Sequence, residues 1–109
     1  MQPLKDVRVV EFTNILSGPF CGMLLSDMGA DVIKVEAPTG DDTRKWGPPY
    51  VPDVQGNDTT ESAYYLCANR NKRSVAMDIA SEQGAQTIRK LAEQCDIFIE
   101  NFFTIHFQK

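Results

Sequence analysis

The sequence lacks the long apolar runs, paired cysteines and excess of basic residues that mark several classes of protein. No run of about 18 apolar residues is present, so it offers no candidate membrane-spanning helix. Its three cysteines form no Cys-x-x-Cys pair, and the single His106 makes no metal-ligand spacing with them. We therefore expect reduced thiols and no metal site. The formal net charge of −4 argues against nucleic acid or an anionic membrane as a partner.

Phosphate-binding fingerprints and targeting signals are also missing. Residues 13–19 contain neither Gly-x-Gly-x-x-Gly nor a Walker lysine, which disfavours a stand-alone flavodoxin-like or dinucleotide-binding domain. The amino terminus passes from Met1-Gln2-Pro3 almost directly into an apolar strand, with no signal peptide or arginine-rich presequence. We expect an intracellular protein, cytoplasmic or mitochondrial. No nucleophile–base pair emerges from the serines and His106, so no catalytic residue is assigned.

What is present is an alternation of β-branched segments with segments of helical periodicity. Strands are expected at residues 7–12, 31–36, 74–78 and 96–100, and helices over 17–28 and 81–95. Ser17 and Ser81 are expected to cap the helices, and Gly29 to end the first of them. This order predicts an α/β fold, a parallel sheet with flanking helices joined by right-handed crossovers.

The segment between the second and third strands is unusually long. Residues 37–62 are rich in proline and glycine and predict a structured loop, which compact domains usually reserve for function. Residues 63–68 predict one or two helical turns. In open α/β sheets ligands bind at the carboxyl ends of the strands, which is where this loop begins.

Three features could bind a ligand, and each has a plainer interpretation. The loop after the first strand points at a helix amino terminus and is either an anion site or an ordinary turn. Glu36 ends the second strand as a ribose-binding acid does, but a solvated carboxylate, or one paired with Lys34 or Arg44, is favoured. The basic cluster at residues 70–73 is either a clamp for phosphate or carboxylate groups or a solvated turn.

Several segments, taken in order, carry a resemblance to a known family. They are residues 4–12, 17–19, 25–36, 40–44, 69–74 and 96–102. Together they closely resemble the amino-terminal part of the class III CoA-transferases, a family that includes formyl-CoA and carnitine CoA-transferases and α-methylacyl-CoA racemases. The run Asp41–Pro49 is most similar to dicarboxylate-type members such as succinate–hydroxymethylglutarate CoA-transferase.

The resemblance implies a Rossmann-like large domain, a small domain and an interlocked homodimer. It implies transfer of CoA between a CoA thioester and a free, dicarboxylic acid through an aspartyl intermediate, with CoA or acyl-CoA as substrate and no tightly bound cofactor. Family positions that contact CoA correspond here to Leu16, Ser17, Ala37, Met77, Asp78, Ile79, Ala80, Asn101, Phe102 and Phe103. To these the basic cluster adds Lys72 and Arg73 as candidate phosphate contacts.

Two departures from the family pattern affect what we expect of CoA binding and of catalytic activity. Relatives often carry a basic residue where this chain has Ala37 and Ala80, and the family's nucleophilic aspartate has no counterpart here. We expect residues 1–102 to form the incomplete amino-terminal part of the large domain, and 103–109 an atypical truncated tail. The chain alone is then inactive. The alternatives are a fragment of an acyl-CoA racemase or epimerase, and a non-catalytic truncated isoform that acts only by association.

Overall fold

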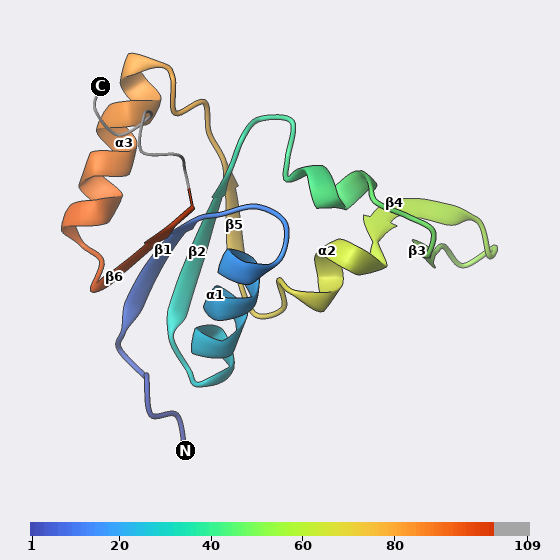
Figure 1. Cartoon of the computed structure of the whole chain (residues 1–109), viewed down its shortest axis with the longest axis horizontal. Coiled ribbons are helices and arrows are strands. Elements are labelled where there is room, and N and C mark those ends of the chain that lie inside the picture. The colour runs from blue at the N-terminus through green and yellow to red at the C-terminus, as the bar shows by residue number, and fades with distance from the viewer. Residues whose placement is uncertain (102–109) are drawn as a thin grey trace.

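Four parallel strands form the centre of the molecule in the computed structural model, which describes residues 1–101 (Figure 1). They are β1 (Arg8–Phe12), β2 (Asp31–Glu36), β5 (Arg73–Ala76) and β6 (Ile97–Glu100), in the order β5-β2-β1-β6. All three pairings are parallel. The predicted α/β fold is confirmed, although the third parallel strand begins one residue earlier than expected and ends at Ala76.

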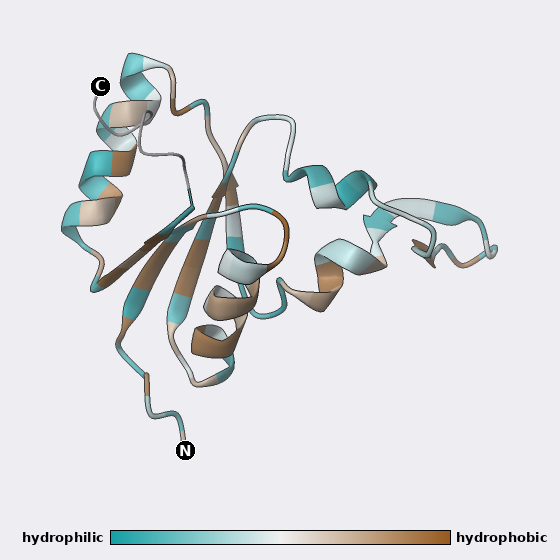
Figure 2. Ribbon diagram, viewed as in Figure 1, coloured by the Kyte–Doolittle hydropathy of each residue, from teal (hydrophilic) through white to brown (hydrophobic). Residues whose placement is uncertain are grey.

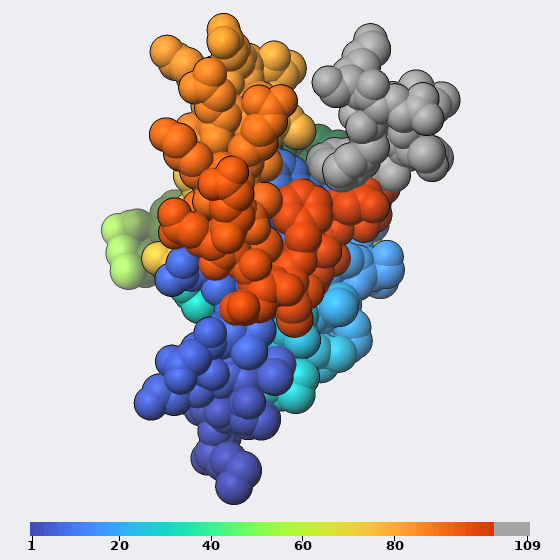
Figure 3. Space-filling view, turned by 90° about the vertical axis from the view of Figure 1, so that its left-hand side faces the viewer, coloured from blue at the N-terminus to red at the C-terminus, as the bar shows by residue number. Residues whose placement is uncertain are grey.

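Side chains alternate along each strand, so both faces of this sheet carry apolar side chains. One helix covers each face. On one face Val9 and Val32 pack with Leu25 of helix α1 (Ser17–Asp27). On the other face Val10 and Val35 pack with Ile88 and Leu91 of helix α3 (Glu82–Glu93), among others. The space-filling view shows α3 and β6 lying together on one side of the molecule (Figure 3).

The helix ends follow the predicted signals at two of three places. Gly29, after α1, has a φ of +102°, the left-handed conformation that glycine adopts without strain. The Ser81 hydroxyl accepts a hydrogen bond from the Gly84 N–H at 3.0 Å and caps α3. The prediction for Ser17 is wrong: Leu16 occupies the cap position without a side-chain hydrogen bond, and Ser17 is the first helical residue.

The predicted long loop contains regular structure of its own. After β2 comes a short 3₁₀ helix, η1 (Asp42–Lys45), and then an antiparallel pair, β3 (Tyr50–Pro52) and β4 (Asp58–Ser62). Helix α2 (Ala63–Cys67) follows, with the Ser62 hydroxyl accepting the Tyr65 N–H at its start. This segment projects from the side of the sheet (Figure 1).

Helix α1 buries mostly small or polar residues and leaves several of its large apolar ones exposed. Its buried residues are Pro19, Gly22, Met23 and Ser26, whereas Phe20, Leu24 and Met28 at its end are 41–45% exposed. Colouring by hydropathy shows the first turn of α1 pale and its later turns brown (Figure 2). Met23 is the large apolar side chain of α1 that is fully buried, because the sheet presents the polar side chain of Glu11 beneath Gly22 of this helix.

Candidate functional site

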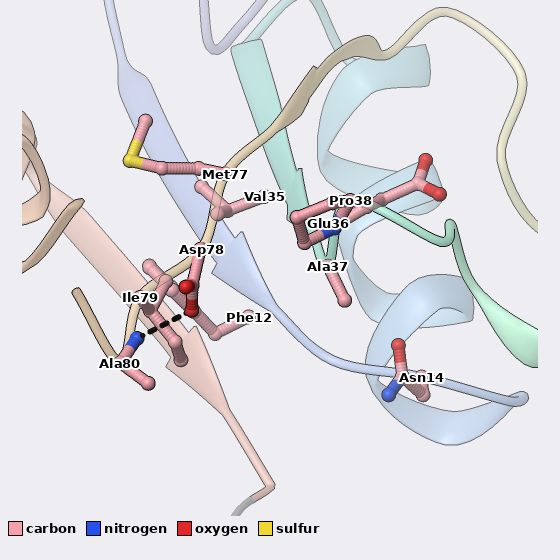
Figure 4. Close-up of a pocket in the computed structure, with 10 residues that line it drawn as sticks. All are labelled: Phe12, Asn14, Val35, Glu36, Ala37, Pro38, Met77, Asp78, Ile79 and Ala80. Atoms are coloured by element: carbon pink, nitrogen blue, oxygen red, sulfur yellow. Dashed lines mark hydrogen bonds between the residues drawn. The ribbon is translucent and has the colours of Figure 1, made fainter.

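A cavity of about 170 Å³ lies where β1, β2 and β5 end, the edge at which parallel α/β sheets bind ligands (Figure 4). Phe12 closes β1, Val35 and Glu36 close β2, and the segment after β5 supplies the opposite wall. The lining residues are Phe12, Asn14, Val35, Glu36, Ala37, Pro38, Met77, Asp78, Ile79 and Ala80.

The cavity is mostly apolar and offers no cationic side chain. Its lining residues include no lysine or arginine. The Asp78 carboxylate accepts the Ala80 N–H at 3.0 Å, and the Glu36 carboxylate points away from the other lining residues (Figure 4). Pockets for whole cofactors usually measure about 300–1,000 Å³, so this cavity fits one uncharged part of such a ligand.

Half of the predicted CoA contacts that the structure describes meet at this cavity. Ala37 on one wall faces the run Met77–Ala80 on the other. Leu16 and Ser17 do not line it, although Asn14 from the same loop does. Asn101 directly follows β6, whose last residue pairs in register with Phe12. Phe102 and Phe103, like residues 104–109, lie outside the described residues.

Lys72 and Arg73 lie elsewhere and already have acidic partners. Arg73 begins β5, at the opposite end of that strand from Met77, and its Nη2 lies 2.6 Å from Asp31 Oδ2. The Lys72 side chain is 2% exposed, and its ammonium lies 2.8 Å from Glu11 Oε2. The solvated-turn interpretation is therefore wrong for Lys72, and contact of either residue with CoA stays a prediction.

Lys72 belongs to a buried ion network that the sequence analysis missed. The Lys34 ammonium lies 3.3 Å from Glu11 Oε1 and 3.0 Å from Asp41 Oδ2, and donates to the Thr13 carbonyl at 2.7 Å. The side chains of Lys34, Glu11 and Asp41 are all 0% exposed. Two ammoniums thus balance two carboxylates beneath α1. A charged residue in each of two buried strands was the available signal.

Glu36 is the other buried acid, and it is paired with Arg44. Its Oε2 lies 2.8 Å from Arg44 Nε, and its Oε1 lies 2.6 Å from Arg44 Nη2. Its side chain is 3% exposed. Of the interpretations left open, pairing with Arg44 is confirmed and the solvated carboxylate is wrong. Burial alone would raise the pKa of Glu36, but hydrogen bonds from Arg44, Ser74, the Asp41 N–H and Tyr65 outweigh it and hold that pKa at about 2.

This low pKa predicts that acid weakens the fold. Because the folded pKa of about 2 lies below the ordinary 4.5, the ionised group stabilises the fold fully above pH 4.5. The contribution should disappear as the pH falls from 4.5 towards 2, by about 3 kcal/mol in total. Urea unfolding at a series of pH values measures this loss. Glu36→Gln should show a shallower dependence over the same range, and an unchanged slope would contradict the assignment.

Within residues 1–101, no three histidine, cysteine or acidic side chains gather in a geometry that would hold a metal ion. No helix in that range combines the length and apolar character needed to cross a bilayer.

Comparison with known proteins gives consistent similarities. The model of the family described as CoA-transferase family III matches residues 4–109. Over 103 residues the chain is 50% identical to the succinyl-CoA:glutarate CoA-transferase of Mus musculus, covering 94% of this chain and 22% of that protein. It is 48% identical to the succinate–glutarate CoA-transferase of Agrobacterium fabrum, covering 92% of this chain and 25% of the other.

A solved structure agrees with both. The crystal structure of a CAIB/BAIF family protein from Brucella suis superposes with a TM-score of 0.88 at 47% identity, covering 98% of this chain and 28% of that one. The chain thus spans about a quarter of the length of the proteins it matches.

Proposed function

Because this chain belongs to CoA-transferase family III, we propose that it supplies part of the CoA site of an enzyme that moves CoA between a thioester and a free dicarboxylic acid. The observation that carries the proposal is the cavity at the strand ends. Ala37 and the run Met77–Ala80, which the family resemblance assigns to CoA, come together there from separate segments. The dicarboxylic acids in the names of the two similar transferases support the acid class.

We assign the cavity to an uncharged portion of CoA. Apolar side chains from β1, β2 and the segment after β5 suit a flat ring or an aliphatic chain. The phosphates would have to lie outside the cavity, since Ala37 and Ala80 offer no positive charge.

The acids beside the cavity do not serve as the nucleophile in this proposal. Family chemistry needs a carboxylate that attacks the thioester carbonyl. Glu36 is held in an ion pair, and Asp78 accepts the Ala80 N–H. We propose that the aspartyl nucleophile is absent from this chain, which alone is then inactive, and that the complete enzyme is a homodimer. Transfer is preferred to racemisation because the similar proteins named above are transferases.

A charge placed at Ala80 tests the proposed CoA site. Ala80→Lys should bind CoA about fivefold more tightly than the parent chain, and Ala80→Glu about fivefold more weakly, because an exposed charge pair contributes up to about 1 kcal/mol. Isothermal titration calorimetry at one low salt concentration measures both affinities.

Val54 provides the matched control for this test. It is 96% exposed and belongs to the turn between β3 and β4 rather than to the cavity lining. Val54→Lys and Val54→Glu carry the same charge changes and should leave CoA affinity within about twofold of the parent. Absence of CoA binding by the folded parent chain, or equal affinities for the two Ala80 variants, would refute the assignment.

A further inference from the structure

The Glu36 carboxylate has no room for a ligand because protein donors occupy it. Its Oε1 accepts hydrogen bonds from Arg44 Nη2 at 2.6 Å, the Ser74 hydroxyl at 2.6 Å and the Tyr65 hydroxyl at 2.9 Å. Its Oε2 accepts the Asp41 N–H at 2.7 Å and Arg44 Nε at 2.8 Å. Five donors exceed the roughly four lone-pair positions of a carboxylate, so a ribose hydroxyl would have to displace one of them.

These bonds enclose the turn that follows β2. The Asp41 N–H bonds back to the side chain of Glu36, and within the turn the Gly40 N–H donates to the Ala37 carbonyl at 2.8 Å. Gly40 has a φ of +83°, and a Cβ added there would lie 3.0 Å from Arg44 Cδ and 3.5 Å from Glu36 Oε2. The ion pair therefore packs directly against this turn.

The same turn forms a wall of the proposed CoA cavity. Ala37 and Pro38 line the cavity at the end of β2, while the Glu36 carboxylate points away from the other lining residues (Figure 4). The positions of these two lining residues thus depend on a carboxylate that faces the other way.

Arg44 connects this wall to the projecting segment. Its guanidinium carbon lies 3.8 Å from the ring centroid of Tyr65, and Nη2 donates to the Tyr65 hydroxyl at 2.7 Å. Tyr65 lies in α2, and the Ser62 hydroxyl that caps this helix donates to the Trp46 carbonyl beyond η1. Arg44 also lines a second, open cavity of about 500 Å³ on the β3–β4 side. The turn is consequently braced from outside the parallel sheet.

We propose that Glu36 and Arg44 are positioning residues, which with Tyr65 fix the turn at residues 37–41 so that one wall of the cavity is shaped for CoA. This rests on the proposed function for the identity of the ligand. The bracing of the turn itself does not depend on that identity.

The test replaces the planar, two-pronged guanidinium by a single ammonium. Arg44→Lys keeps the positive charge but cannot hold both Glu36 oxygens and stack on Tyr65 in the same way. Arg70→Lys is the matched control, since Arg70 also makes a two-pronged pair, with Asp27, and lies in the turn before β5 rather than at the cavity. Tyr65→Phe is a milder second variant, which removes one hydroxyl from the cluster.

Amide hydrogen exchange is measured first, because it needs no ligand. The Gly40 and Asp41 amides should exchange about tenfold faster in Arg44→Lys than in the parent, and faster in Tyr65→Phe, with no change in Arg70→Lys. Unchanged protection of these amides in both cluster variants would overturn the proposal, whether or not CoA binds.

CoA titration of the same proteins is the second readout. Arg44→Lys should weaken binding about tenfold through the displaced wall, while Arg70→Lys stays within twofold of the parent. A parent that binds CoA together with an Arg44→Lys variant of equal affinity would overturn the positioning role. Faster amide exchange in the two cluster variants, together with a parent chain that does not bind CoA, would instead count against the proposed function alone.

Discussion

Replacing Lys34 by methionine is expected to lower the free energy of unfolding by about 3–5 kcal/mol, the cost of breaking a buried ion pair from one side. The ammonium lies 3.0 Å from Asp41 and 3.3 Å from Glu11, and all three side chains are 0% exposed. Glu11 keeps Lys72 at 2.8 Å, so the larger loss falls on Asp41. Urea denaturation followed by circular dichroism measures the change.

Lys90 gives the control for this substitution. It is exposed near the end of α3, where methionine has nearly the same helix propensity as lysine, so Lys90→Met should change stability by less than about 0.5 kcal/mol. Adding Asp41→Asn to Lys34→Met should recover part of the loss, because the unpaired charge is then removed. Equal stability of the Lys34 and Lys90 variants would show that the buried network contributes little.

Gly84→Ala is expected to destabilise the protein by about 3 kcal/mol, at the upper end of the usual range for overpacking. An alanine in place of glycine inside a helix normally stabilises by about 1 kcal/mol, so the expected sign is reversed. The reason is the close approach of α3 to the segment before it: an added Cβ would lie 1.9 Å from the Asp78 carbonyl oxygen. A backbone atom cannot rotate away as a side chain would.

Gln83→Ala, at the neighbouring exposed position of α3, isolates helix propensity from this contact. It should leave stability unchanged or slightly raised. Thermal unfolding of both variants and of the parent measures these changes in stability. A Gly84→Ala protein as stable as Gln83→Ala would contradict the predicted clash. Since Asp78 and Ala80 line the cavity, the Gly84 variant should also lose CoA affinity.

The parallel sheet could be predicted because its signals are local. The β-branched runs around Val9 and Val32 and the glycine at position 29 fix strands and a helix end without reference to the rest of the chain. The antiparallel pair β3–β4 was missed because its strands are short, one contains Pro52, and the other reads as polar throughout. Such a pair is stabilised by neighbouring elements more than by its own composition.

The candidate site could be predicted only in part, and for a similar reason. Ala37 and the run after β5 follow strand ends, which parallel topology brings to a common edge. The partners of Glu36 could not be ranked from the sequence, since Tyr65 and Ser74 approach it from 29 and 38 residues away. Lys72 seemed available to a phosphate because sequence alone does not show that Glu11 reaches it beneath α1.

The pairing of Glu11 with Lys34 also has a consequence for how β1 and β2 align. Alternation of inward and outward side chains disfavours a slip of one residue, because it would move every side chain to the other face. A slip of two residues keeps all faces correct, and aliphatic strands alone tolerate it. Here such a slip would set Lys34 beside Val9, or Glu11 beside Val32, and bury a charge against a hydrocarbon. The ion pair thus selects one alignment among those that hydrophobic packing leaves nearly equivalent, and the strand ends that form the cavity meet only in that alignment.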